Sequence, residues 1–455
     1  MGKVLTETRS LQRTLIPDAE EWESYELPSL QGISRKAKQQ PDYRFSDLSS
    51  CLNPTHLKHA FRRMNQKAAS GVDKVTYCDY RDNLDENLEE LVKRLKAGSY
   101  KARLVKRKHI PKAGGKTRPL GLPVFEDKLL QTTVSDILSA IYEQVFHDCS
   151  YGYREKRSAR QAADDLAVRL QFGRFGYVVE ADIQGFFNHI DHEILLGFIE
   201  QRVNDRRFVR LIRKWLKAGI LEEDGQITEP EEGTPQGGSI SPILANIYLH
   251  HVIDDWFEGV VKPHCAGEAM MCRYADDFVC SFQYKRDADR FYEVLTKRLE
   301  RFNLQAAPEK TKRLRFSRFA PGLKNRFEFL SFEFYWKEDK AGTPRVFRRT
   351  GRSKLQSTKN KYSEYIKCSR HVRTPVLLDR VSIKLRGYYN YFGVVGNLDD
   401  LYTVYFHVVG QLYKWLNRRS GRRSMTWEKL KRLITYRALA RPVCKAIERS
   451  QRIWL

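Results

Sequence analysis

The sequence lacks the features that mark secreted, membrane-spanning and zinc-binding proteins. Its eight cysteines form no CxxC pair, and no Cys/His cluster has the spacing of a zinc site. The N-terminal stretch has no apolar signal core, and no run approaches the ~18 apolar residues that a membrane span needs. These absences predict a soluble, intracellular protein with free thiols and no membrane-spanning segment.

Acidic residues are scarce relative to basic ones, and the imbalance is concentrated near the C-terminus. The 455 residues include 81 Lys and Arg against 56 Asp and Glu, a formal net charge of +25. Residues 341–455 alone contain 26 basic and 6 acidic residues, a net charge of +20. Tyrosines and tryptophans are interspersed with these cations, which is typical of surfaces that bind phosphates and stack on bases. We therefore expect a polyanionic partner, either nucleic acid or an anionic membrane surface.

Helical and strand-like periodicities follow one another irregularly along the chain. The length and the hydrophobic content of 41% allow two to four globular domains. The pattern predicts a cationic hairpin at 101–123, a buried strand at 175–183 and a glycine-rich loop leading into a helix at 233–257. A second hairpin at 272–281, a helix at 288–302 and a strand pair at 327–334 follow. From 375 onward the periodicity is mainly helical. Because regular βαβ alternation is missing, we expect an α+β fold with an antiparallel sheet and helices on one face.

Two adjacent aspartates, Asp276 and Asp277, lie in the middle of an otherwise apolar hairpin with the sequence CRYADDFVCS. Asp182 ends an apolar strand, so three carboxylates converge if the two strands are neighbours. Carboxylates this close destabilise one another unless cations neutralise them, and oxygen ligands without His or Cys select Mg²⁺ or Mn²⁺. The alternative is an ordinary turn, because Asp favours turns for local hydrogen-bonding reasons.

Six ordered motifs resemble those of reverse transcriptases. The stretch YADD at 274–277 has the form that is common in group II intron reverse transcriptases. IPKAGGKTRPLGLP (110–123) is similar to the fingers motif of that family, and EADIQGFFNHIDH (180–192) is similar to its palm motif. GTPQGGSISPILANIYL (233–249) resembles the QGxxxSP motif. LQAAPEKTKRL (304–314) resembles the lysine-bearing motif, and FEFLSFEF (327–334) resembles the primer grip. The thumb, or maturase (X), domain is similar to IKLRGYYNYFG (383–393) and WLNRRSGRR (415–423). The resemblance covers about residues 55–455.

This resemblance implies a right-hand polymerase in three parts. Residues 1–54 would be an N-terminal extension, 55–335 the fingers (mainly 55–175) and palm (mainly 176–335), and 336–455 the basic, mainly α-helical thumb or X domain. The implied function is an RNA-directed DNA polymerase of the bacterial cytoplasm or nucleoid. Its partners would be an RNA template, a DNA or RNA primer, dNTPs and group II intron RNA.

The resemblance also assigns roles around a pair of metal ions. Asp182, Asp276 and Asp277 would be the catalytic ligands of two Mg²⁺ ions, with Mn²⁺ as an alternative, and the backbone carbonyl of Ile183 would join them. The ions would activate the primer 3′-hydroxyl and stabilise the leaving pyrophosphate. Lys310 would assist the pyrophosphate as charge stabiliser or general acid, unless it is a plain surface lysine.

A second set of residues would contact the incoming dNTP. Phe186 would be the steric gate that excludes a ribose 2′-hydroxyl, with Phe187 pointing into the core. The alternatives are that both rings are core residues or that the gate lies one position away. The triphosphate and the nascent base pair would meet Lys112, Arg118, Gln236 and Gly237.

A third set would bind template, primer and structured RNA. It comprises Gly238, Tyr274, Phe329, Leu330, Arg386, Tyr389, Arg418, Arg419, Arg422 and Arg423. About half of the aromatic residues in the stretch YYNYF at 388–392 are expected to be packing residues instead.

The chain ends soon after the thumb motifs, without a Cys/His-rich endonuclease segment, so we do not expect it to cleave a target DNA strand. Three functions stay open. The first is a reverse transcriptase that also acts as a maturase on intron RNA. The second is a free-standing, domesticated reverse transcriptase in DNA repair or phage defence. The third is an RNA-binding splicing factor with a vestigial polymerase, against which the intact aspartates Asp182, Asp276 and Asp277 argue.

Overall fold

The computed structural model describes residues 28–111, 117–234, 237–320, 322–339, 341–419 and 425–444. The chain divides into two compact units and passes between them three times. The first unit comprises Met1–Phe146 and Gly185–His251, and the second comprises His147–Gln184 and Val252–Leu455. Helices and antiparallel strand pairs occur in both units, which confirms the predicted α+β class.

The first unit is organised around the helix α5 (Phe125–Tyr142), whose apolar side chains are buried on nearly every side. Helices α1 (Pro28–Gln39), α2 (Pro54–Arg63) and α9 (Ser241–Leu249) pack against it. The other helices of this unit that the structure describes are α3 (Tyr77–Asp82), α4 (Leu84–Lys96), α7 (His192–Glu200) and α8 (Arg206–Leu216).

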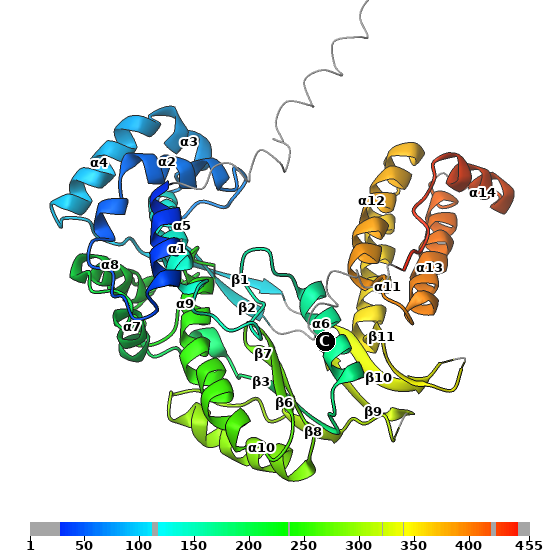
Figure 1. Cartoon of the computed structure of the whole chain (residues 1–455). Coiled ribbons are helices and arrows are strands. Elements are labelled where there is room, and N and C mark those ends of the chain that lie inside the picture. Colours follow the sequence, from blue (N-terminus) through cyan, green and yellow to red (C-terminus); the bar gives the residue numbers. More distant parts are fainter. Residues whose placement is uncertain are drawn as a thin grey trace, which may run out of the picture. The chain divides into compact units, whose positions relative to one another are not determined.

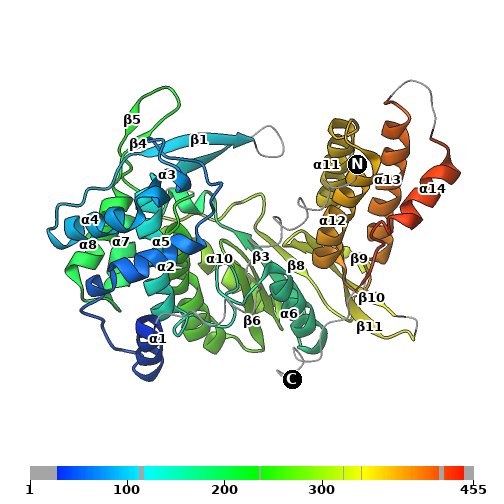
Figure 2. The ribbon, with the colours of Figure 1, turned by 90° about the horizontal axis from the view of Figure 1, so that it is seen from above.

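A four-stranded sheet in the order β2-β1-β4-β5 completes the first unit (Figure 2). Its strands are β1 (Val105–Pro111), β2 (Thr117–Leu122), β4 (Ile220–Leu221) and β5 (Ile227–Thr228). β1 and β2 pair antiparallel from Lys106 opposite Leu122 to Pro111 opposite Thr117, which confirms the predicted cationic hairpin.

The second unit contains a four-stranded antiparallel sheet in the order β6-β7-β3-β8 (Figure 1). Its strands are β3 (Tyr177–Asp182), β6 (Ala269–Tyr274), β7 (Asp277–Phe282) and β8 (Lys312–Arg315). β3 is an inner strand, and its successive residues Val178 and Val179 are both fully buried, as in a strand covered on both faces. The hairpin β6–β7 is the one predicted at 272–281.

Helices cover both faces of this sheet, so the prediction of helices on one face is wrong. On one face, the ring of Phe291 in α10 (Lys285–Glu300) lies 5.2 Å from the ring of Phe282 in β7. On the other, Cys272 of β6 donates its thiol hydrogen to the carbonyl of Ala162 in α6 (Ala159–Phe172). Successive residues of a strand alternate between faces, and Cys272 and Phe282 fall on opposite ones by the β6–β7 register. The helix on the second face is α6, which precedes the strands of the sheet in the sequence.

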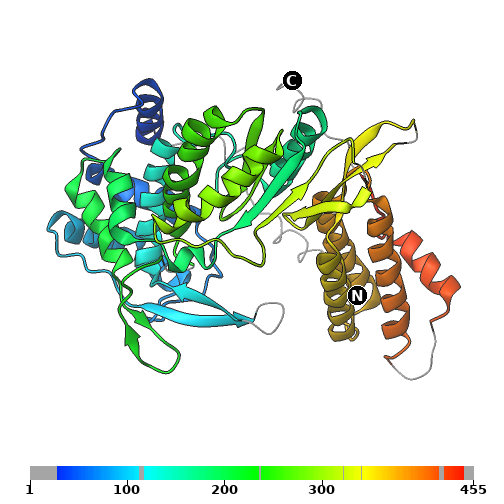
Figure 3. The same ribbon diagram turned by 90° about the horizontal axis from the view of Figure 1, so that it is seen from below.

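A second antiparallel sheet, in the order β11-β10-β9, follows along the chain. Its strands are β9 (Gly322–Phe329), β10 (Phe332–Glu338) and β11 (Pro344–Thr350). It leads into α11 (Arg352–Cys368), α12 (Thr374–Phe392), α13 (Leu398–Leu416) and α14 (Trp427–Tyr436). α11, α12 and α13 run side by side (Figure 3), and their apolar faces form one core with the aromatic residues of β9 and β10. Among the helices that the structure describes, none combines the length and apolar character that crossing a bilayer requires.

Candidate active site

The ends of two neighbouring strands bring the predicted carboxylates together. Asp182, the last residue of β3, is the register partner of Asp277, the first residue of β7. Side chains of directly opposed residues share one face of a sheet, with Cβ atoms about 4.5–5.5 Å apart. Asp276 precedes Asp277 in the two-residue loop between β6 and β7, and its charge acts on Asp277. The second unit therefore holds all three carboxylates in one site.

The negative charge of this site is incompletely compensated. The pKa of Asp277 is raised to about 8, first by burial and then by the charge of Asp182. Glu180 and Asp276 act in the same direction. The ammonium group of Lys310 hydrogen-bonds to the carboxylate of Asp182, and this bond raises the pKa of Lys310. The Lys310 side chain is 65% exposed, so solvent screens its charge, and a divalent cation would stabilise the carboxylates further.

The turn that carries Asp276 is held from the opposite face of the sheet. Arg273 is fully buried, and its Nε donates to Oδ1 of Asp254 at 2.7 Å. Its Nη1 donates to the carbonyl oxygen of Ala275 at 3.1 Å, and its Nη2 donates to Oγ of Ser150 at 2.8 Å. Ala275 has φ +57°, a left-handed conformation that costs an L-residue about 1–2 kcal/mol. The buried Arg273–Asp254 pair thus fixes a strained turn.

The segment before α6 lies against the same turn. The Tyr151 amide donates to the Arg273 carbonyl at 2.9 Å, and the Arg273 amide donates to the Cys149 carbonyl at 2.7 Å. A Cβ atom on Gly152 would lie 2.3 Å from the backbone nitrogen of Ala275. Only glycine allows this approach without displacing the backbone of the turn.

Arg273, Asp254 and Gly152 are not among the residues that the motifs predict. The available signal was the charge of Arg273 within the apolar run AMMCRY, because a charge in a buried strand needs a partner. The sequence could not have said which acidic residue serves as that partner.

The described members of the predicted dNTP set lie in the first unit. Arg118 is exposed on β2. Gly237 has φ +116°, and a Cβ atom there would lie 2.5 Å from the carbonyl oxygen of Gly121. Its glycine is therefore already required by packing against β2. Two further members, Lys112 and Gln236, lie outside the described residues.

The two phenylalanines of the predicted gate are both largely buried. Phe186 is 1% exposed and its ring packs 5.4 Å from that of Phe187 and 6.3 Å from that of Tyr248. Phe187 is 8% exposed. Both rings are buried, Phe186 more deeply, so the gate at Phe186 stays a prediction, with Phe187 one position away as the alternative.

The predicted nucleic-acid contacts divide into buried and exposed residues. Phe329 is 0% exposed and Tyr389 is 6% exposed, and both belong to the core of the second unit. Their prediction as contact residues is wrong because the core occupies their rings. Gly238 is also buried, Tyr274 and Leu330 are half-buried, and Arg386, Arg418 and Arg419 are exposed. Arg422 and Arg423 lie outside the described residues.

The donor set at the three aspartates suits a hard divalent cation. All of its donors are oxygens, and burial together with the charges of the neighbouring carboxylates raises the pKa of Asp277, so a cation would favour its ionised form. Ile183, whose carbonyl is the fourth predicted ligand, is buried and forms an antiparallel bridge with Ala306. That carbonyl remains a predicted ligand.

Comparison with known proteins gives matches over this part of the chain. Residues 110–334 match the family described as reverse transcriptase (RNA-dependent DNA polymerase). The group II intron-encoded protein LtrA of Lactococcus lactis subsp. cremoris is 40% identical over 227 residues, which cover 49% of this chain and 37% of that protein. Protein YkfC of Escherichia coli K12 is 34% identical over 239 residues, covering 46% of this chain and 62% of that protein. A putative COX1/OXI3 intron 1 protein of Saccharomyces cerevisiae is 32% identical over 181 residues, covering 40% of this chain and 21% of that protein. The match thus spans less than two thirds of each of these relatives.

Proposed function

We propose that this chain, a member of the group II intron reverse transcriptase and maturase family, extends a primer 3′-hydroxyl with dNTPs on an RNA template. The observation that carries the proposal is the direct pairing of Asp182 with Asp277, beside the turn that holds Asp276. All three aspartates lie inside the segment 110–334 that matches the family. A splicing factor with a vestigial polymerase would have no reason to keep three mutually repelling carboxylates together.

The three aspartates and the Ile183 carbonyl would hold two Mg²⁺ ions, and Mn²⁺ would substitute. When bound, these ions lower the pKa of the attacking hydroxyl and neutralise charge on the leaving pyrophosphate. Lys310, which contacts Asp182 in the structure, would be released toward a pyrophosphate oxygen and act there as charge stabiliser or proton donor.

A second set of residues would position the dNTP. Arg118 lies in β2, and together with Lys112 it would neutralise the triphosphate, with the arginine able to bind two oxygens at once. Gln236 and Gly237 would border the nascent base pair. A phenylalanine at 187, or at 186 if that ring moves, would exclude the ribose 2′-hydroxyl.

We assign the polymerase parts to the observed elements. The palm is the sheet β6-β7-β3-β8 with α6 and α10, and the fingers contain the β1–β2 hairpin and the helices around α5. The thumb contains α11 to α14. The net charge of +20 over residues 341–455, with Arg386, Arg418 and Arg419 exposed, supports binding of a template–primer duplex and of intron RNA by their phosphates.

Primer extension tests the polymerase proposal. We expect the wild-type chain to extend a DNA primer on an RNA template with Mg²⁺ and dNTPs. We expect Asp276→Ala to abolish extension while the affinity for template–primer is retained. Synthesis by the Asp276→Ala variant would refute the assignment of this site.

Splicing tests the maturase part separately. A maturase should accelerate self-splicing of the group II intron that contains its reading frame, at a salt concentration where the RNA alone reacts slowly. A gene outside any intron, together with undiminished extension activity, would instead favour the free-standing reverse transcriptase.

A further inference from the structure

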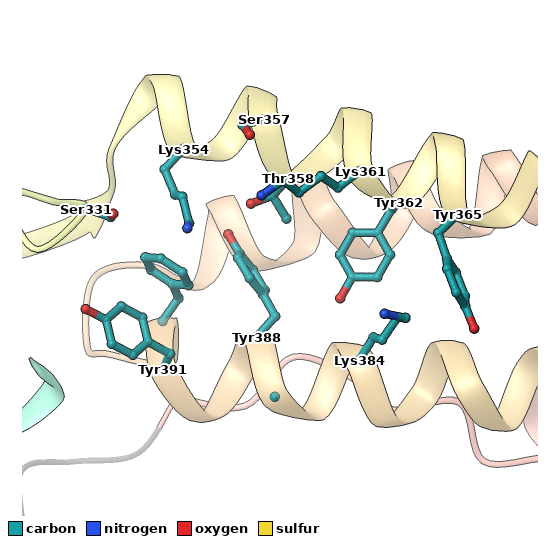
Figure 4. Close-up of a pocket in the computed structure, with 12 residues that line it drawn as sticks. Ser331, Lys354, Ser357, Thr358, Lys361, Tyr362, Tyr365, Lys384, Tyr388 and Tyr391 are labelled. Atoms are coloured by element: carbon teal, nitrogen blue, oxygen red, sulfur yellow. The ribbon is translucent and has the colours of Figure 1, made fainter. Parts of the chain in front are cut away.

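A pocket of about 450 Å³ lies between α11 and α12, beside the turn that joins β9 to β10 (Figure 4). This volume is within the range of about 300–1,000 Å³ that is usual for small-molecule sites. The residues of α11 that line it recur at helical spacing, which places them on one face, and those of α12 do the same. The lining comprises Ser331, Lys354, Ser357, Thr358, Lys361, Tyr362, Tyr365, Lys384, Gly387, Tyr388, Tyr391 and Phe392.

The pocket carries positive charge that the described residues do not neutralise. Lys354 and Lys361 come from α11 and Lys384 comes from α12, while none of the described lining residues is acidic. None of the three lysines forms an ion pair with a described residue. Lys354 and Lys384 extend into the space between the two helices (Figure 4). Like charges that converge on a concave surface favour an anionic ligand.

Tyrosine rings form the walls of the pocket, and hydrogen bonds fix two of them. The hydroxyl of Tyr391 donates to the carbonyl of Leu330 at 3.0 Å, and the hydroxyl of Tyr388 lies 3.2 Å from Oγ1 of Thr350. Tyr365 lies under Lys384, whose Nζ is 4.4 Å from the ring centroid. The pocket is therefore preformed, and it offers aromatic surface next to its cations, which is the combination that nucleotides require.

Gly387 lies in the interior of α12, at the pocket. Glycine is a poor helix former, so a helix interior retains it at a cost in stability. A Cβ atom at this position would meet no other atom within 4 Å. The protein's own packing therefore does not require glycine here, whereas a ligand that approaches the helix backbone would.

We propose that this pocket binds one nucleotide unit of a nucleic-acid strand, with its backbone phosphate among Lys354, Lys361 and Lys384 and its path passing over Gly387. The sugar or base would then lie against Tyr365 or Tyr391. The proposal rests on the proposed function only in that a nucleic acid must be bound. The phosphate belongs either to the template–primer duplex or to a structured RNA, which share this chemistry.

Salt-dependent binding tests the proposal. We would measure the affinity of the full chain for a fluorescent RNA–DNA template–primer, and separately for a structured intron RNA, over a series of KCl concentrations without dNTPs. The affinity falls as salt rises, and each lost phosphate contact decreases the steepness of log affinity against log salt by roughly 0.7–0.9. Lys354→Ala and Lys361→Ala should each show that decrease, whereas Lys359→Ala, on the same helix but outside the pocket, should not.

Filling the pocket provides a second, charge-neutral arm. Gly387→Leu should weaken binding at least tenfold without lowering the melting temperature, while Gly387→Ala, which leaves most of the space open, should bind like the wild type. The ligand whose affinity falls identifies the source of the phosphate.

Wild-type affinity of both Gly387→Leu and Lys361→Ala for both nucleic acids would overturn this inference. In that case, continued primer extension by the wild type would leave the proposed function intact. If the wild type binds neither nucleic acid and extends no primer, the proposed function and this inference both fail.

Discussion

At the scale of single residues, Asp277 is the group whose charge matters most. Burial and neighbouring carboxylates disfavour its ionised form, so a divalent ion should stabilise the folded protein by relieving that repulsion. We expect Mg²⁺ to raise the melting temperature of the wild type, and Asp277→Asn to remove most of this increase. Polymerase activity should fall by about 10³-fold, because several kcal/mol of transition-state stabilisation depend on the ions.

Thermal unfolding with EDTA or Mg²⁺, beside primer extension, provides the measurement. Asp224→Asn, which removes an exposed carboxylate far from the site in sequence, is the matched control and should respond to Mg²⁺ like the wild type. An undiminished Mg²⁺ effect in Asp277→Asn would place the ions elsewhere.

The pair of Arg273 and Asp254 makes a separate prediction, because it acts behind the site. Asp254→Asn leaves the buried guanidinium without its counter-charge, which should lower the free energy of unfolding by about 3–5 kcal/mol. The double variant Asp254→Leu with Arg273→Met should recover most of that stability, since apolar replacement of a buried pair is often neutral. It should not recover extension activity, because the carbonyl of Ala275 loses its donor.

Urea unfolding and primer extension on the wild type, Asp254→Asn and the double variant separate the two effects. Arg273 and Asp254 are positioning residues only if the double variant recovers stability without recovering extension activity. Parallel recovery of both would reduce the pair to a purely structural role.

The neighbouring phenylalanines differ in accessibility, and this difference predicts which one discriminates sugars. Phe187→Ala should increase ribonucleotide incorporation relative to deoxynucleotide incorporation by at least about tenfold, by removing a wall against the 2′-hydroxyl. Phe186→Ala should mainly lower stability, by about 3–5 kcal/mol, as expected for a core ring. Competition between rNTPs and dNTPs in primer extension checks this, and the reverse assignment would restore the gate to Phe186.

At the scale of elements, the β6–β7 hairpin depends on the segment before α6. Gly152→Ala would push a methyl group against the backbone of Ala275 and shift the turn that carries Asp276. We expect extension activity to fall at least about tenfold, since small misplacements of catalytic groups are costly. Gly410→Ala in α13 is the control, because no atom lies within 4 Å of its added methyl group and a helical Gly→Ala change should stabilise. Equal activities of the two variants would contradict the packing argument.

The elements themselves were well predicted where local pattern decides them. The apolar run at 175–183 is β3, the hairpin at 272–281 is β6–β7, and the alternating basic stretch at 101–123 contains β1 and β2. What local pattern does not carry is which face a distant helix covers. The periodicity of the alanine-rich α6 does not indicate which strand it packs against, so its packing on the second face of the sheet was not predicted.

The same distinction explains the predicted contact residues. Phe329 and Tyr389 belong to motifs associated with nucleic acid. A motif indicates that an aromatic residue is present, but it does not indicate which way the ring points. In this protein both rings belong to the core that joins β9 and β10 to the helices α11 to α13. The carboxylates were predictable because charge in an apolar setting has few explanations, whereas aromatic residues in a helix have many.

At the scale of the whole molecule, the net charge of +25 predicts a strong dependence of RNA binding on salt. If six to ten phosphates are contacted, the affinity should fall by about 10³–10⁵-fold between 50 and 200 mM salt. Filter binding or fluorescence anisotropy over that range measures the slope. A shallow slope would mean that stacking and apolar contacts, rather than phosphates, supply most of the affinity.

The free cysteines scattered along the chain have a practical use at the scale of the whole molecule. All eight cysteines are free, and two of them are exposed, Cys78 in α3 of the first unit and Cys368 at the end of α11 in the second. A hydrogen bond to Glu364 raises the pKa of Cys368, so its reaction with maleimide should quicken as pH rises. Donor and acceptor dyes on these two native positions would measure the distance between Cys78 and Cys368, with and without a bound template–primer.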